Sequence, residues 1–374
     1  MAVDWRHVRS EFPALTRWTF LDTATFGQLP RRAVEAVARH FAHRDELACS
    51  DFLAWFDDAD RLRALLGRLV GANPEDIAFI PNAATALGLL VEKLPWRRGD
   101  RVVTLRDEFP NNLYAAAVLG RRGVEPLEAG WPELLGLVDA RTRLVIVSSV
   151  NYVTGFRVPL AEVAAAARAA GALLYVDGTQ SVGALRLDVR RCGVDMLAVH
   201  GYKWLLCPNG AGFMYVAPKL RAMLEPAVVG WRSHRDWRQV DALHHGAPEW
   251  KPDAERYEGG MLSFPLLYAM AASVGLMLEI GPEAIEERVL ELAARVREAL
   301  RGLGARLPAD EAPHFDSPVI AAEFAGRDAP SLARALRHDR VLVSARHGFL
   351  RVSPHFYNDE ADIARLEEGL RRLL

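Results

Sequence analysis

Two charged side chains stand where buried strands are expected to end, and their chemistry is complementary. Asp177 follows the apolar run 173–176, and Lys203 follows the run 196–199. A buried carboxylate needs a positive partner to stay ionised, and a buried amine loses its proton easily. A neutral amine can attack an aldehyde, while the carboxylate could pair with a protonated pyridine nitrogen. The two residues therefore fit the two ends of one cofactor, although either alone is more often a member of a structural ion pair.

A phosphate could be held at a second place in the chain. The apolar run 77–80 leads into Asn82, Ala84 and Thr85, and an apolar helical pattern follows. Small residues at the start of a helix let backbone N–H groups and the Thr85 hydroxyl close on a phosphate. Asn82 is equally suited to capping the helix, so both interpretations stay open at this point.

An aromatic ring follows another expected strand. Phe109, fixed by Pro110, comes shortly after the run 102–105. Such a ring could lie flat on a bound heteroaromatic group, where offset stacking adds about 0.5–1.5 kcal/mol beyond burial. For an isolated phenylalanine, packing in the core is the simpler explanation.

The elements that must position these residues form an alternating pattern. Short apolar runs typical of strands buried on both faces occur at 77–80, 101–105, 144–148, 173–176 and 196–199. Such strands belong to parallel sheets covered by helices, and ligands bind beyond the carboxyl ends of those strands. One βαβ unit is especially clear: a strand ending near Val150, a helix opened by Pro159 and closed by Gly171, and the next strand. The run 212–216 predicts a further, returning strand.

The pattern changes after about residue 255. Helical spacing predicts a helix over 266–280, a long helix over 285–303 and a final helix over 363–373, and short strands are expected at 319–321, 341–343 and 350–352 around a helix at 331–338. This is an α+β arrangement. We therefore expect an N-terminal arm at 1–15, a large cofactor-binding domain at 16–265 and a small C-terminal domain at 266–374.

Composition narrows the class of partner. The 46 Lys and Arg residues nearly balance 48 Asp and Glu residues, so no strong field draws the chain onto nucleic acid or anionic lipid, and a small substrate fits better. No stretch is long and uncharged enough to cross a membrane, and we expect a cytoplasmic protein. Cys49, Cys192 and Cys207 lack metal-ligand spacing, so neither a disulfide framework nor a metal site is expected.

The segment from Tyr175 through Val216 resembles the lysine region of the aminotransferase class V family. That pattern is an aspartate, a glutamine or histidine three residues later, and a lysine after a strand, matched by Asp177, Gln180 and Lys203. Further matching motifs lie at 20–24, 256–260 and 350–358. The resemblance covers almost the whole chain. It implies the α/β fold type I of pyridoxal 5'-phosphate (PLP) enzymes, with a mostly parallel seven-stranded sheet between helices and a smaller C-terminal α+β domain.

The resemblance also implies roles for individual residues. Lys203 would hold PLP as a Schiff base and move the Cα proton, Asp177 would pair with the pyridine nitrogen, and Gln180 would bond the phenolic oxygen. The other implied cofactor contacts are Ala84, Thr85, Phe109, Asn112, Tyr202, Trp231 and Ser263. Arg351 would clamp the substrate carboxylate, with His355, Tyr257 and Tyr152 lining the substrate side. Members of the family usually form homodimers that share the active site, and the resemblance implies the same here.

The positions of the cysteines narrow the range of reactions that the chain could catalyse. Desulfurases of the family need a nucleophilic cysteine in the last part of the chain, and none occurs after Cys207. The stretches 107–114, 150–155 and 225–231 look most like the kynureninase side of the family. However, Ser263 stands where kynureninases carry an asparagine, Gln180 replaces their usual histidine, and Met261 replaces a threonine common elsewhere in the family.

Three hypotheses follow. The leading one is a lyase acting at Cβ of an amino acid, cleaving C–S in a cysteine conjugate or acting in a kynureninase-like way. The second is an aminotransferase or an epimerase like isopenicillin N epimerase, which would use the same residues. The third, a binding protein that keeps the fold without turnover, predicts loss of the lysine or the aspartate, and Lys203 and Asp177 are both present.

Overall fold

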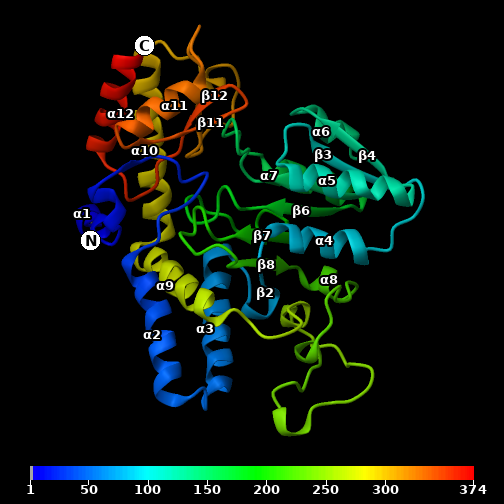
Figure 1. Ribbon diagram of the computed structural model, residues 1–374. Coiled ribbons are helices and arrows are strands. Elements are labelled where there is room, and N and C mark those ends of the chain that lie inside the picture. The colour runs from blue at the N-terminus through cyan, green and yellow to red at the C-terminus, as the bar shows by residue number, and fades with distance from the viewer. Residues whose placement is uncertain (1–2) are drawn as a thin grey trace.

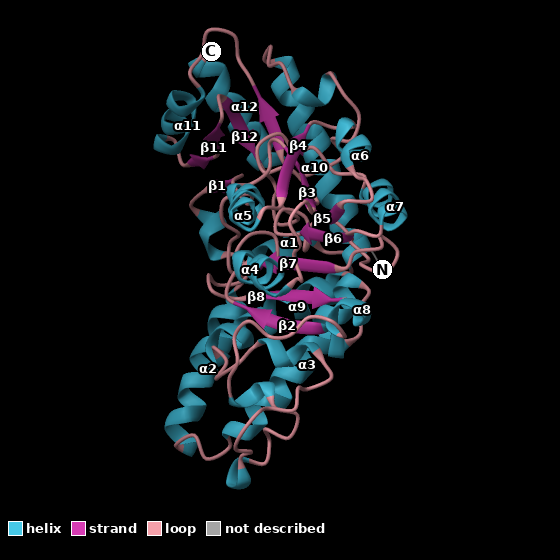
Figure 2. Ribbon diagram, turned by 90° about the vertical axis from the view of Figure 1, so that its right-hand side faces the viewer, coloured by secondary structure: helices cyan, strands magenta, loops and turns pink. Residues whose placement is uncertain are grey.

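The computed structural model describes residues 3–374 and is built around one large sheet. Seven strands lie in the order β2-β8-β7-β6-β5-β3-β4 (Figures 1 and 2). Their bounds are β2 Ile77–Ile80, β3 Arg101–Leu105, β4 Glu125–Ala129, β5 Thr142–Ser148, β6 Leu173–Asp177, β7 Met196–His200 and β8 Gly212–Val216. Six of these strands run in the same direction, and β8 alone runs in the opposite direction. The predicted fold class, a mostly parallel seven-stranded sheet between helices, is confirmed.

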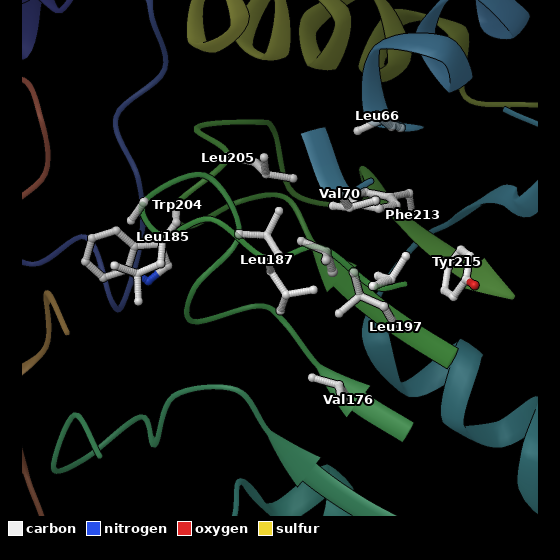
Figure 3. Packing of buried hydrophobic residues seen from close by; sticks show 14 of the residues in the cluster. Leu66, Val70, Val176, Leu185, Leu187, Leu197, Trp204, Leu205, Phe213 and Tyr215 are labelled. Atoms are coloured by element: carbon white, nitrogen blue, oxygen red, sulfur yellow. The ribbon is translucent and has the colours of Figure 1, made fainter. Parts of the chain in front are cut away.

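Both faces of the sheet are covered, which explains why its strands are apolar throughout. Val176, Leu197 and Phe213 point to one face, where Leu66 and Val70 of α3 (Phe52–Val70) pack against them (Figure 3). The opposite face is packed in a second cluster with helices α4 (Ala83–Lys93) and α5 (Pro110–Leu119). Side chains alternate between faces along a strand, so a strand between two helical layers needs apolar residues at every position.

The predicted βαβ crossover is present. α7 (Leu160–Ala170) connects β5 to β6, and Gly171 ends it at φ +73°. A side chain would be strained in that left-handed conformation, which glycine adopts freely. The crossover returns the chain parallel to β5, so Ser148 and Asp177 become register partners at the carboxyl ends of the two strands.

Further helices extend the molecule beyond β2. α2 (Arg31–Leu47) and α3 pack with α9 (Phe264–Ile280) into a group that projects from the sheet (Figures 1 and 2). α10 (Pro282–Gly302) then runs from this group toward the C-terminal part (Figure 1). The remaining short helices are α1 Trp5–Ser10, α6 Glu133–Leu137 and α8 Pro218–Arg221.

The C-terminal part has its own sheet and core. β9 (Ile320–Ala322), β12 (Phe349–Val352) and β11 (Ser344–Arg346) form an antiparallel sheet covered by α11 (Ala329–His338) and α12 (Glu360–Leu373). β1 (Thr19–Phe20) pairs in parallel with β10 (Val341–Leu342), so an N-terminal strand joins this part of the molecule. Leu21 accordingly packs in the C-terminal core.

Three strands were not expected from the sequence: β1, β4 and β11. β4 is an edge strand whose residues Glu125, Pro126 and Glu128 carry no strong apolar signal. Edge strands tolerate proline and charge because one side faces solvent. β11 is short and is defined by its pairing with β12.

The predicted division of the chain at residue 265 stays a prediction, and Met1 and Ala2 of the predicted arm lie outside the described residues. Within residues 3–374, no single helix has the length and apolar character of a membrane span, whereas α9 and α10 together meet that test as a pair bent by 84°.

Candidate active site

A cavity lies beyond the carboxyl ends of β5, β6 and β7. Asp177 ends β6, Ser148 ends β5 and His200 ends β7, so the parallel strands deliver these side chains to one edge. The cavity is lined by Asn82, Ala83, Phe109, Asn111, Ser148, Tyr152, Asp177, Thr179, Gln180, His200, Tyr202 and Lys203. The two residues that the sequence singled out as complementary therefore share one cavity.

Lys203 lies in a tight turn directly after β7 and is 7% exposed. The N-terminal segment holds this turn, because Gly27 N–H donates to the Tyr202 carbonyl at 2.8 Å. A Cβ on Gly27 would come within 2.0 Å of the Lys203 carbonyl oxygen, so only glycine fits there. The N-terminal segment thereby fixes the backbone that carries the amine.

Burial lowers the pKa of Lys203 to about 8, and the positive charges of Arg351 and Arg346 act in the same direction. Asp177 opposes this effect. The amine is therefore neutral far more often near pH 8 than an exposed lysine would be, which is the state a nucleophile requires.

Asp177 is a buried carboxylate without a basic partner. It is 6% exposed, and its Oδ1 accepts a 2.9 Å hydrogen bond from Thr179 N–H. Among residues 3–374 it forms no salt bridge. Burial raises its pKa, while Thr179 and the Lys203 ammonium oppose that rise. A carboxylate in this state suits a ligand that brings its own cation, such as a pyridinium nitrogen.

Gln180 lies at the same edge with its amide held on both sides. Its Nε2 donates to the Ala24 carbonyl at 3.1 Å, and its Oε1 accepts from Trp204 Nε1–H at 2.8 Å. The second Nε2 hydrogen has no partner in these contacts and is available toward the cavity that Gln180 lines. The side chain is thus oriented before any ligand arrives.

The start of α4 lies at another side of the cavity. Asn82 caps the helix by accepting from Thr85 N–H at 3.1 Å, so the capping interpretation is confirmed. Asn82 and Ala83 line the cavity, whereas Ala84 and Thr85 are exposed beside it. Tyr202 also lines the cavity from the lysine turn. A helix N-terminus next to a cavity favours an anion such as a phosphate.

Phe109 lines the cavity and is supported by a buried polar group. Glu108 accepts hydrogen bonds from Ser148 N–H (2.6 Å), Ser148 Oγ–H (2.5 Å) and Asn112 Nδ2–H (2.8 Å). Asn112 is fully buried beneath the cavity wall and is not itself part of the lining, and its Oδ1 has no partner among the described residues. Burial raises the pKa of Glu108 despite these bonds, and nearby Asp177 adds to the rise.

Arg351 lies on β12 and is 1% exposed. Its Nη1 donates to the Tyr152 carbonyl at 2.6 Å, and its Nη2 donates to Thr25 Oγ1 at 2.5 Å. Asp22 Oδ1 lies 3.4 Å from Nη2, and Nε donates to Ser344 Oγ at 3.1 Å. Burial lowers the pKa of Arg351 to about 10, against the raising effect of Asp22. One Nη1 hydrogen is left for an incoming carboxylate in this arrangement.

Eight of the sequence-predicted residues lie outside the cavity lining: Ala84, Thr85, Asn112 and Arg351, described above, and His355, Tyr257, Trp231 and Ser263. His355 is fully buried, with Nε2 2.9 Å from the Trp204 carbonyl, and burial lowers its pKa to about 3. Tyr257 donates to the Leu224 carbonyl at 2.7 Å, and Trp231 packs edge-on against Trp237. Ser263 is exposed at the start of α9. The single chain therefore does not bring His355, Tyr257, Trp231 or Ser263 into the cavity of Lys203.

Other residues line the cavity without having been selected from the sequence. Ser148, Thr179 and His200 stand at or just after strand ends, so the rule that selected Asp177 and Lys203 would have found them. Asn111 and Ala83 carry no such signal. Burial, with a contribution from the Lys203 charge, lowers the pKa of His200 to about 4, so this ring is neutral at pH 7. Within residues 3–374, no cluster of three or more His, Cys, Asp or Glu is arranged to hold a metal.

Comparisons with known proteins agree with this geometry. The profile of the family described as aminotransferase class-V matches residues 19–366. An isopenicillin N epimerase of Streptomyces clavuligerus is 31% identical over 403 residues, covering 100% of this chain and 99% of the relative. A probable cysteine desulfurase of Aeropyrum pernix is 30% identical over 409 residues, covering 98% and 97%.

Solved structures share the fold. A form of C-DES with glycine covalently linked to its PLP cofactor superposes with a TM-score of 0.88 at 23% identity, covering 97% of this chain and 98% of that one. The apo cysteine desulfurase of Thermococcus onnurineus gives a TM-score of 0.87 at 23% identity, covering 100% and 99%.

The cavity fits the cofactor of this family. A buried amine with a lowered pKa and a buried carboxylate without a basic partner suit the two ends of PLP. The family profile spans most of the chain, and the fold is that of fold type I. The chain belongs to the aminotransferase class V family and is a PLP-dependent enzyme.

Proposed function

We propose that this enzyme is a lyase that acts at Cβ of an α-amino acid, with a cysteine conjugate as the substrate and its C–S bond as the bond cleaved. The observation that carries the proposal is the shared cavity of Lys203 and Asp177, which has the Arg351 guanidinium behind Tyr152 at its substrate side. PLP, when bound, supplies an electron sink conjugated to Cα. The family relatives include enzymes named as epimerases and desulfurases, so chemistry that begins at Cα is common to them.

Each residue of the candidate site would have its own role in the reaction. The Lys203 amine would hold the cofactor aldehyde and would take the proton from Cα of the substrate. Asp177 would keep the pyridine nitrogen protonated, and Gln180, held by Ala24 and Trp204, would donate its remaining amide hydrogen to the phenolic oxygen. Phe109 would cover one ring face, and the backbone near Ala84, the Thr85 hydroxyl and Tyr202 would hold the phosphate. Arg351 binds the substrate carboxylate by a charge-assisted bond.

Five further proposed contacts involve residues that lie outside the cavity lining. Asn112 would act from beneath the cavity wall through Glu108 and Ser148. Trp231, Ser263, Tyr257 and His355 stay predictions, because the single chain places them outside the cavity lining.

The cysteines support elimination over persulfide chemistry. Cys207 is 2% exposed, its Sγ–H donates to the Leu205 carbonyl, and burial raises its pKa. Cys49 and Cys192 are only partly exposed, and neither lines the cavity. A thiol that attacks substrate sulfur must reach it as a thiolate, so we propose no desulfuration by this chain.

An epimerase is the second candidate. Two isopenicillin N epimerases are 31% and 29% identical over 100% of this chain. Such a reaction would share proton removal by Lys203 and would return a proton to the opposite face of Cα. An aminotransferase would instead leave the cofactor as pyridoxamine phosphate.

We also propose a cytoplasmic homodimer with a shared active site. Large apolar side chains are exposed at Val34 and Phe41 on α2 and at Val228, Val229 and Met261 in the irregular segment before α9, a segment that extends away from the sheet in Figure 1. Burial of such side chains favours association. Light scattering after size exclusion would give the molecular mass, and a mass of one chain would contradict the proposal.

One set of experiments tests the function. The purified protein with PLP should be yellow, and the visible band should disappear on borohydride reduction and be absent in Lys203→Ala. Incubation with S-substituted cysteines should release pyruvate and free thiol in equal amounts. A change in the optical rotation of the amino acid without pyruvate would indicate epimerisation, and accumulation of pyridoxamine phosphate would indicate transamination. Either result would contradict the lyase.

A further inference from the structure

Two ring side chains from distant parts of the chain meet at the edge of the cavity. Tyr152 follows β5 and lines the cavity, and its hydroxyl lies 2.9 Å from Nε2 of His347. The two rings meet edge to face, and Tyr152 meets Phe109 in the same way at 5.2 Å between centroids. The Tyr152 carbonyl also accepts the Arg351 bond, so both ends of this tyrosine are held.

His347 adopts a left-handed backbone conformation that is uncommon for residues other than glycine. Arg346 and Phe349 are register partners, so His347 and Gly348 form the two-residue turn between β11 and β12. Both have positive φ, +48° and +88°. That turn favours Asn, Asp or Gly at its first position, and a histidine there is strained. A strained residue that persists points to a function of its side chain.

The two residues of the Tyr152–His347 contact differ in solvent exposure. Tyr152 is half-buried against the cavity, whereas His347 is exposed to solvent. Burial raises the pKa of Tyr152, and the guanidiniums of Arg346 and Arg351 oppose that rise. The phenol therefore keeps its proton at neutral pH, and the same two charges would stabilise the phenolate once the proton has left.

We propose that Tyr152 and His347 form a proton relay between solvent and the group that leaves Cβ, with Tyr152 as the catalytic acid and His347 as its positioning and recharging residue. The inference rests on the proposed function. As the Cβ–S bond breaks, its electron pair goes to sulfur, which takes the Tyr152 hydroxyl proton and leaves as a thiol. The phenolate oxygen takes the proton from Nε2 of His347, and Nδ1 of the exposed ring receives one from water.

The relay is tested with leaving groups of different acidity. Tyr152→Phe is expected to lower kcat about 100-fold for S-ethylcysteine, whose thiol is weakly acidic, since general acids contribute roughly 10²–10⁴. For S-(4-nitrophenyl)cysteine, whose thiol is acidic and leaves without help, kcat should change less than about threefold on the same reasoning. An equal loss for both conjugates would overturn the relay.

His347→Asn distinguishes a role of His347 in proton transfer from a role in the β11–β12 turn, because asparagine suits the turn better than histidine. The relay predicts a kcat lower by about tenfold for the ethyl conjugate, restored by added imidazole, which can reach the exposed site. If asparagine leaves kcat unchanged, or if imidazole has no effect, His347 serves the turn alone. Exposed His338→Asn and Tyr114→Phe are matched controls and should leave both rates unchanged.

A measurement on the apoenzyme does not depend on turnover. With ¹⁵N-histidine labelling, the His347 signal is assigned by its loss in His347→Asn, and it should show a proton on Nε2 and shift in Tyr152→Phe. A proton on Nδ1 instead would overturn the direction of transfer. Failure of the proposed function is recognised separately, because the wild type would then form no pyruvate from either conjugate.

Discussion

The Arg351 guanidinium lies 2.5 Å from the Thr25 hydroxyl, although the two residues are 326 positions apart in the chain. Asp22 of the same N-terminal segment faces the same guanidinium nitrogen at 3.4 Å. Residues 22–27 of this segment thus contact two sites: Asp22 and Thr25 contact Arg351, and Gly27 contacts the turn that carries Lys203. The N-terminal segment therefore contacts both the Arg351 guanidinium and the turn that carries Lys203.

Asp22→Asn should destabilise the protein through Arg351. Asp22 is the single acidic partner of this fully buried arginine among the described residues. Loss of one member of a buried pair costs roughly 3–5 kcal/mol, and we expect the lower end because the bonds to Thr25 and Tyr152 remain. Urea unfolding would measure this cost. Glu367→Gln, which removes an exposed i,i+4 partner of Arg371, should change the free energy of unfolding by less than about 0.5 kcal/mol.

Lys203→Met should stabilise the apoenzyme, and the gain should depend on pH. Burial depresses the pKa of Lys203 from 10.5 to about 8, which corresponds to about 3 kcal/mol. The cost of the buried charge is complete below pH 8, falls between pH 8 and 10.5, and is absent above. Unfolding at pH 7 and pH 10 would therefore show a larger gain at pH 7. A gain independent of pH would mean that packing, not charge, causes it; exposed Lys93→Met serves as the control.

Gly27→Ala should disturb the lysine turn. The new Cβ would lie 2.0 Å from the Lys203 carbonyl oxygen, a backbone atom that cannot move alone. We expect a loss of about 1–3 kcal/mol, the usual cost of overpacking, together with weaker PLP binding. Fluorescence titration of the apoenzyme would measure the affinity. Gly88→Ala in α4 meets no atom within 4 Å and should instead be neutral or stabilising, so equal effects of the two variants would refute the explanation.

Glu255→Gln should weaken the fold in a pH-dependent way. Desolvation would raise the pKa of Glu255, but Arg63, Arg232 and Lys251 lower it from 4.5 to about 2. Its stabilisation, about 3 kcal/mol, is complete above pH 4.5 and is lost as pH falls toward 2. The difference between wild type and variant in urea midpoints should therefore shrink from pH 6 to pH 3. A constant difference would contradict an electrostatic cause.

The strand ends were predictable because their signal is local. Asp177 and Lys203 each follow a run of apolar residues, and parallel strands place their carboxyl ends at one edge. The edge strand β4 gave no such signal, because a strand with one free side needs no continuous apolar run. Glycine and proline marked the ends of α7 correctly for the same local reason.

The sequence alone determined the fold class and the cofactor, and it singled out the amine and the carboxylate that the structure brings into one cavity, since these signals lie in short motifs of the chain. The tertiary structure decided the rest. It linked Asp22 and Thr25 to Arg351, brought His347 to Tyr152, and placed His355 and Tyr257 in the packed interior instead of the cavity. Such contacts join residues more than thirty, and up to more than three hundred, positions apart, and no local pattern encodes which distant partner satisfies a buried polar group.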